Sequence, residues 1–161
     1  MTDLNKLLSP IFLEEKEIRK LMELLFFSFR DFTAGPNKIL KKINFGRTHH
    51  RIIYFVKKHK KITIKELLQI LLVTKQSLSR MLDQLVQQKY INMSVGDDKR
   101  TKNVTLTDKG LEFEKKLSDM QIIKLKNIFQ NIDENDINSF KKILFTMIDS
   151  EGKKIFNKLN E

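Results

Sequence analysis

The chain has no cysteine among its 161 residues. This absence excludes disulfides, zinc sites built on thiolates and cysteine-based redox switches. Proline and glycine are also scarce, at 2 and 5 residues, which is typical of a helix-rich chain with few sharp loops. No apolar run approaches the ~20 residues of a membrane span, and the first ten residues lack the basic start and apolar core of a secretory signal. We therefore expect one soluble, cytoplasmic domain over residues 1–161, with no membrane partner.

Positive charge is abundant and concentrated in the middle of the chain. Residues 38–109 contain 17 Lys and Arg against 5 Asp and Glu, whereas the remaining residues contain 14 against 15. A compositional bias toward lysine would raise the charge everywhere, so it does not account for the nearly neutral flanks. A basic segment of this kind indicates a polyanionic partner, and nucleic acid is the commonest one.

The first predicted helix carries more apolar surface than a small core needs. Ser9 and Pro10 are its expected N-cap and first residue, its apolar stripe continues to Phe32, and Gly35-Pro36 is expected to end it. A stripe this wide indicates that the helix packs against two surfaces, one of them on another subunit.

The basic segment begins with shorter helices. Ile62-Thr63 is expected to open a helix that ends near Leu72, and Thr74 is the expected N-cap of the next helix. These two helices, joined by a three-residue turn, have the dimensions of a helix-turn-helix. The predicted helices of this segment cover about 37–43, 47–59, 64–72 and 75–89.

The sequence period then changes from helical to alternating. Residues 90–95 and 103–106 alternate apolar and polar side chains, and the polar stretch 96–102 separates them, which predicts a β-hairpin. Thr107 is expected to cap a long helix, and Asp133 a last helix. A helix-turn-helix followed by a two-stranded wing is a winged helix, so the predicted fold class is mainly α with a small β component.

The helix over 75–89 has a polar face suited to the major groove of DNA. Its apolar residues gather on one side, and Arg, Gln and Ser side chains lie on the other. Arginine can bond guanine bidentately, glutamine can bond adenine, and serine can donate or accept. The free N–H groups of the first turn can bind phosphate. The expected DNA contacts here are Thr74, Lys75, Gln76, Ser77, Ser79, Arg80 and Gln84.

The tip of the hairpin supplies a second set of expected DNA contacts. Asp98 precedes Arg100 by two residues and is expected to hold its guanidinium in one pose. Such an arginine can enter a minor groove, whose narrow A/T stretches attract cations. The expected contacts of the wing are Asp98, Lys99, Arg100 and Lys102.

Three segments together resemble the MarR family of transcriptional regulators. Residues 98–110, DKRTKNVTLTDKG, are similar to the wing of that family, which has an Asp-x-Arg tip and then Leu-Thr-x-x-Gly at the start of a long helix. Residues 74–80 are similar to the start of its recognition helix, and residues 45–51 to a run found in one branch of the family.

The resemblance implies a homodimer that reads a pseudo-palindromic operator in double-stranded DNA. It implies a winged-helix lobe over residues 36–109, flanked by dimerisation helices over 9–34 and 110–159. It also implies that Asp98 and Arg100 act in the minor groove, while Gln76, Ser77 and Arg80 face the major groove.

Many members of this family sense small aromatic acids, so the resemblance also implies an aromatic or phenolic effector. The candidate residues for its crevice are Phe26, Phe29, Phe45, His49 and Arg51, and a plain core role for the Phe residues is the alternative. We expect no metal, because the adjacent residues His49 and His50 point about 100° apart on a helix. We expect no cofactor and no catalytic residue, since the chain has no Gly-rich phosphate loop, nucleophile elbow or His-Glu-x-x-His motif.

The expected function is therefore that of a sequence-specific DNA-binding regulator, expected to be a repressor that a small aromatic ligand releases. An architectural protein that coats DNA with little sequence preference is the alternative. A protein–protein adaptor that has lost DNA binding is a third interpretation, against which the dense lysines and Arg100 argue. A regulator binds its specific site ~10³–10⁷-fold more tightly than other DNA, and a coating protein does not.

Overall fold

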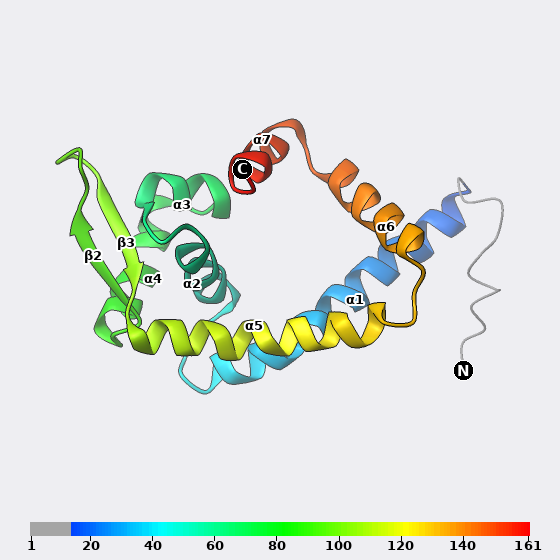
Figure 1. Cartoon of the computed structure of the whole chain (residues 1–161), viewed down its shortest axis with the longest axis horizontal. Coiled ribbons are helices and arrows are strands. Elements are labelled where there is room, and N and C mark those ends of the chain that lie inside the picture. The colour runs from blue at the N-terminus through cyan, green and yellow to red at the C-terminus, as the bar shows by residue number, and fades with distance from the viewer. Residues whose placement is uncertain (1–13) are drawn as a thin grey trace.

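The computed structural model describes residues 14–161, and the expected N-cap at Ser9 lies outside them. That part of the chain contains seven helices and one small sheet, and the sheet lies at one end of the molecule, from which α1 and α5 extend (Figure 1). The winged-helix architecture predicted from the sequence is confirmed. The helices are α1 (Glu15–Lys41), α2 (Arg47–His59), α3 (Ile64–Leu71), α4 (Lys75–Gln87), α5 (Asp108–Phe129), α6 (Glu134–Met147) and α7 (Ser150–Lys158), and the strands are β1 (Ile62–Thr63), β2 (Ile91–Val95) and β3 (Lys102–Leu106).

Helix α1 does not end at Gly35-Pro36, and that prediction is wrong. The helix continues to Lys41, so the separate helix expected over 37–43 forms its last turns. A proline inside a helix costs about 3 kcal/mol, because it lacks an N–H and its ring crowds the preceding turn. Packing offsets this cost here, since Pro36 is buried and Gly35 lies so close to Met120 of α5 that a Cβ would overlap it.

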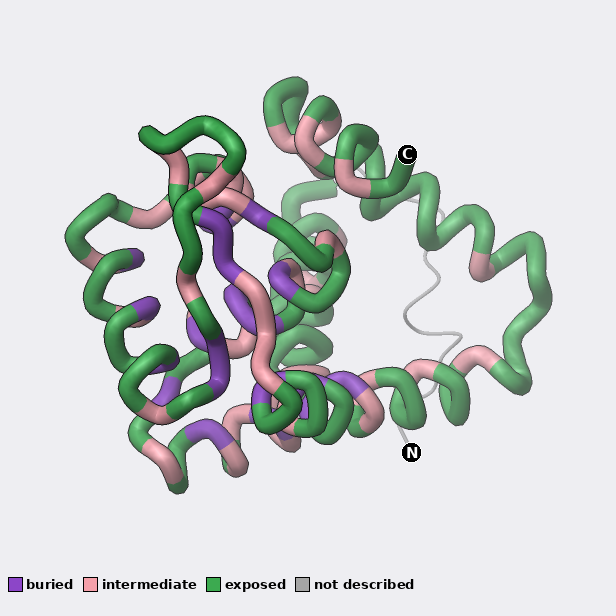
Figure 2. The backbone as a smooth tube through the Cα atoms, turned by 60° about the vertical axis from the view of Figure 1, so that its left-hand side comes forward, coloured by how far each residue is buried: buried purple, intermediate pink, exposed green. Residues whose placement is uncertain are grey.

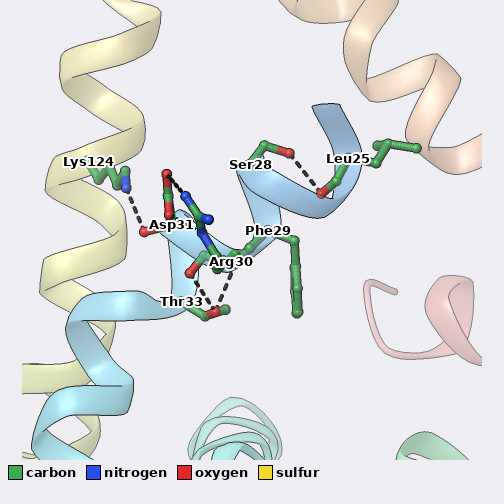
Figure 3. A network of polar contacts seen from close by, with 7 residues as sticks. All are labelled: Leu25, Ser28, Phe29, Arg30, Asp31, Thr33 and Lys124. Atoms are coloured by element: carbon green, nitrogen blue, oxygen red, sulfur yellow. Dashed lines mark hydrogen bonds and ion pairs between the residues drawn. The ribbon is translucent and has the colours of Figure 1, made fainter. Parts of the chain in front are cut away.

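Helices α1 and α5 pack along each other although the whole winged-helix segment separates them in sequence. Lys124 Nζ of α5 donates to the main-chain oxygen of Asp31 in α1 at 2.6 Å, and Arg30 Nε donates to the Asp31 carboxylate at 2.7 Å (Figure 3). This contact joins two helices that also pack where Gly35 of α1 meets Met120 of α5.

The helix-turn-helix forms because each of its helices has a local start signal. Thr63 Oγ1 accepts from the N–H of Glu66, and Glu66 Oε2 accepts from the N–H of Thr63 at 2.9 Å, which is a capping box at the start of α3. Helix α3 ends at Leu72, whose φ of 51° is left-handed. The expected cap of α4 is confirmed, since Thr74 Oγ1 accepts from the N–H of Ser77 at 3.1 Å.

The sheet has three antiparallel strands in the order β1-β3-β2. The predicted hairpin is confirmed, with Ile91 opposite Leu106 and Val95 opposite Lys102. Ile62 and Thr63 precede α3 as expected, with Thr63 as its N-cap, and they also form a third strand that pairs with β3, which was not expected. Ile62 is 2% exposed opposite Val104, so its burial favours the extended conformation and ties the wing to the helix-turn-helix.

Thr107 caps α5 as expected, with its Oγ1 accepting from the N–H of Gly110 at 3.0 Å. Asp133 caps α6, but the expected single last helix is wrong. The chain is extended at Ile148, and Asp149 starts α7 by accepting from the N–H of Gly152. Helix α7 returns to the winged helix, where Lys58 Nζ donates to Asn160 Oδ1 at 2.6 Å.

The hydrophobic core lies in the winged-helix lobe, with contributions from Leu40 of α1 and Leu117 of α5. Figure 2 shows buried positions gathered there, whereas α6 and α7 contain no buried residue. Over residues 14–161, no helix combines the length and apolar character required to cross a membrane.

Candidate nucleic-acid interface

Helix α4 has the two faces that its sequence predicts. Leu78, Leu82 and Leu85 are at most 1% exposed and pack into the core. Val86, expected on the same side, is 38% exposed and lies at the edge of that face. The exposed polar residues of the helix are Lys75, Gln76, Ser79, Arg80, Asp83, Gln84 and Gln87, with Ser77 half-buried.

Thr74 and Lys75 shape the start of α4. Its hydroxyl oxygen accepts the Ser77 N–H, so the side chain already satisfies one donor of the first turn. The remaining first-turn N–H groups, with the exposed ammonium of Lys75 beside them, form a positive end that suits a phosphate.

Asp98 shapes the wing tip through its backbone contacts, which corrects the expectation that it holds the Arg100 guanidinium. Its Oδ1 accepts from the backbone N–H of Arg100 at 2.9 Å. Its main-chain oxygen accepts from the N–H and hydroxyl of Thr101, at 2.8 and 2.7 Å. This turn leaves the side chains of Lys99 and Arg100 exposed at the end of the hairpin.

A groove of about 740 Å³ separates the wing from helices α3 and α4. Ser79 and Asp83 of α4 line it, so it brings the recognition helix and the wing together. Sequence reasoning missed one cation, Lys65, because the pattern of α3 indicated only the core side of that helix. The cationic residues that line this groove are Lys65, Lys75, Arg100 and Lys102.

His49 and Phe45 lie in the packed interior rather than in a ligand crevice. Their rings stack with centroids 4.5 Å apart and planes 3° apart, and the residues are 8% and 6% exposed. Burial lowers the pKa of His49 more than its hydrogen bond with Gln84 raises it. The imidazole is therefore neutral near pH 7.

A separate cavity of about 400 Å³ lies between α1, α2 and α5. Of the residues expected in a crevice, it contains Phe29 and Arg51, whereas Phe26 is 66% exposed beside it. Sequence reasoning missed most of the wall, because helical spacing does not reveal which turns of two helices meet. The residues lining the cavity are Phe29, Phe32, Thr33, Asn37, Arg47, His50, Arg51, Tyr54, Ser118, Gln121, Ile122 and Leu125.

His50 lines this cavity, and its buried Nε2 has no hydrogen-bond partner among residues 14–161. Desolvation lowers its pKa, and the charge of nearby Glu114 opposes that shift to a smaller extent. Glu114 is 2% exposed, pairs with Lys57 of α2 and accepts from the hydroxyl of Ser118. The cavity is thus bordered by a neutral imidazole and by Ser118, whose hydroxyl bonds the compensated carboxylate of Glu114.

Comparison with known proteins relates this geometry to one family. A family model described as MarR family matches residues 43–101. The HTH-type transcriptional regulator PetP of Rhodobacter capsulatus is 34% identical over 152 residues, which cover 94% of this chain and 92% of PetP.

Solved structures share the fold at lower identity. A mutant of MarR from E. coli complexed with operator DNA is 22% identical with a TM-score of 0.64, covering 88% of this chain and 100% of that one. Streptococcus pneumoniae FabT in complex with DNA is 19% identical with a TM-score of 0.71, covering 81% and 94%. A MarR protein of Peptoclostridium difficile is 19% identical with a TM-score of 0.68, covering 93% and 96%.

Proposed function

This chain belongs to the MarR family of DNA-binding transcriptional regulators, and from that premise we propose that it represses transcription as a homodimer on a pseudo-palindromic operator. The observation that carries the proposal is the groove between α4 and the wing, where four cations from α3, α4 and the wing meet beside the exposed polar face of α4. A positive groove next to a helix with free Arg, Gln and Ser side chains suits a DNA duplex.

In this proposal α4 lies in a major groove and the wing in the adjacent minor groove. Gln76, Ser77 and Arg80 face base edges, while Arg100 reads groove width and charge. Phosphate contacts come from Thr74, Lys75, Ser79, Lys99 and Lys102, with Lys65 added from the groove, and Gln84 contacts either a phosphate or a base edge.

A second copy of the chain is the proposed partner of the helices outside the lobe. Helix α1 exposes Leu21, Met22 and Phe26 by 53%, 61% and 66%, and α6 exposes Ile143 and Met147 by 59% each. Apolar patches of this extent mark association surfaces. Dimerisation is assigned to residues 9–34 and 110–159, of which 9–13 lie outside the described residues, and DNA binding to 36–109.

The cavity of about 400 Å³ is the proposed site for a small aromatic acid that releases the DNA. Its aromatic wall is Phe29, Phe32 and Tyr54, and Arg47 and Arg51 supply positive charge for a carboxylate or phenolate. Titration with a series of hydroxybenzoates should show saturable binding that Arg51→Met weakens. Equal binding to the Arg51→Met variant would place the ligand elsewhere.

Selection of bound duplexes from a random pool tests the function. For a sequence-specific regulator, the selection should recover an inverted repeat. Its half-site centres should lie about 10 base pairs apart, or a whole number of helical turns apart. A set of duplexes without any repeat, combined with a low ratio of specific to non-specific affinity, would favour the architectural alternative.

A further inference from the structure

His49 joins two helices of the winged-helix lobe through its two ring nitrogens. Its Nδ1 lies 3.1 Å from the backbone nitrogen of Gly46, at the start of α2. Its Nε2 lies 2.7 Å from Oε1 of Gln84, on the exposed face of α4. The ring is held between these contacts by stacking on Phe45.

The contact with Gly46 fixes which nitrogen carries the proton. A backbone N–H can only donate, so Nδ1 must accept and be unprotonated. In the neutral imidazole the hydrogen then lies on Nε2, which donates to Gln84 Oε1. This hydrogen bond uses one of the two lone pairs of the Gln84 carbonyl oxygen and holds that oxygen toward His49.

This arrangement changes what Gln84 can bond on DNA. Bidentate pairing of a glutamine with adenine needs its carbonyl oxygen as acceptor and its NH₂ group as donor. With its carbonyl oxygen turned toward His49, the Gln84 carboxamide is oriented so that its NH₂ group points away from that contact, and the residue is exposed on α4. Gln84 is thus suited to an acceptor, either a phosphate oxygen or a base-edge acceptor such as guanine O6 or N7.

We propose that His49 is a positioning residue for DNA recognition, which orients the Gln84 carboxamide so that Gln84 acts as a hydrogen-bond donor to the duplex. The proposal rests on the proposed DNA-binding function. His49 itself is 8% exposed, so in this proposal it acts on the duplex only through Gln84. His49 orients the side chain of Gln84, which is the residue proposed to contact the duplex from α4.

Two substitutions of His49 separate its two contacts. The oxygen of asparagine lies two bonds beyond Cβ, as Nδ1 does. His49→Asn therefore keeps an acceptor for the Gly46 N–H and loses the hydrogen bond to Gln84. The amide nitrogen of glutamine lies three bonds beyond Cβ, as Nε2 does, so His49→Gln keeps a donor for Gln84. Both variants lose the ring that stacks on Phe45, so they are matched for the loss of packing.

Affinities for the selected duplex are measured for both variants, for Gln84→Ala and for each double variant. One hydrogen bond contributes about 1 kcal/mol, which is about fivefold in affinity per subunit. We expect His49→Asn and Gln84→Ala to weaken binding by about that factor and His49→Gln to restore most of it. In the Gln84→Ala background, His49→Asn should have no further effect, whereas in a Gln87→Ala background its effect should persist.

The pattern of loss identifies the acceptor. A base acceptor gives a changed preference at one symmetric position of the selected site, and a phosphate gives an equal loss on selected and random duplexes. If the wild-type protein binds the duplex and the single variants bind it equally well, the positioning role is wrong while the DNA-binding function stands. Absence of wild-type binding would instead contradict the proposed function, and this proposal with it.

The tautomer of His49 is a measurement that needs no variant. Imidazole nitrogen-15 shifts of the wild-type protein should show a protonated Nε2 and an unprotonated Nδ1. The opposite tautomer would overturn the proposal, because Nε2 would then have no hydrogen to donate to Gln84.

Discussion

Removing the ammonium of Lys57 should destabilise the protein more than removing that of its neighbour Lys58. Lys57 compensates Glu114, whose side chain is 3% exposed between α2 and α5. Breaking a buried pair by deleting one partner costs about 3–5 kcal/mol. The Lys57 side chain is 43% exposed, so water reaches the ammonium side and we expect about 2–3 kcal/mol for Lys57→Met.

This loss corresponds to a fall in Tm of about 5–10 °C for a chain of this length. Thermal and urea unfolding at one fixed protein concentration measure it, because self-association makes stability depend on concentration. Lys58→Met is the matched control, since Lys58 bonds only the exposed amide of Asn160. It should cost less than about 1 kcal/mol.

The double variant Lys57→Met, Glu114→Leu tests the reason for the effect. Replacing a whole buried pair with apolar residues is often neutral or stabilising, so the double variant should regain most of the stability that Lys57→Met loses. A double variant as unstable as the sum of its single variants would refute the explanation by an uncompensated buried charge. A Lys57→Met protein with the same Tm and urea midpoint as the wild type would refute it as well.

Three further outcomes are expected. Gly110→Ala should lower the free energy of unfolding by about 1–3 kcal/mol, because a Cβ there overlaps the main-chain oxygen of Tyr90; a urea midpoint equal to that of the wild type would contradict this. Arg80→Ala should weaken DNA binding by about 1–3 kcal/mol and relax the base preference at one symmetric base pair. Arg100→Ala should reduce the slope of log affinity against log salt concentration by about one unit per subunit. Exchanged phenotypes would refute the assigned roles. Burial lowers the pKa values of His49 and His50 below 6.5, so the unfolded chain binds their protons more readily. Their contribution to stability is complete above pH 6.5 and lost as the pH falls below it, which urea midpoints between pH 7.5 and 5.5 should follow.

The sequence was sufficient for elements whose signals are local. The change from helical to alternating period located the hairpin, and Thr74 and Thr107 cap their helices as expected. Pro36 shows the limit of such signals, because packing against α5 outweighs a strong local preference to end the helix. Ile62 likewise forms a strand because Val104, 42 residues later, provides a partner.

The candidate site was predictable in its residue types and less so in its contacts. The polar face of α4 follows from helical period, and the exposed side chains there agree with it. Which partner Asp98 bonds depends on the turn geometry, and two residues of spacing fit a backbone contact as well as a guanidinium. An apolar stripe does not distinguish the core from a cavity wall, and Phe45 and His49, expected in the crevice, stack in the interior and do not line the cavity.

The packing of α1 against α5, with the hydrogen bond from Lys124 to Asp31, has a consequence for synthesis of the chain. Asp31 and Lys124 are 93 residues apart, so at about 5–20 residues per second a ribosome needs roughly 5–20 s after making one to make the other. During that interval the winged helix can collapse on its own leucine-rich interior, while the apolar side of α1 has no partner from its own chain. A nascent or prematurely terminated chain that stops before α5 therefore presents an uncovered amphipathic helix, the kind of surface that chaperones bind and that aggregates recruit.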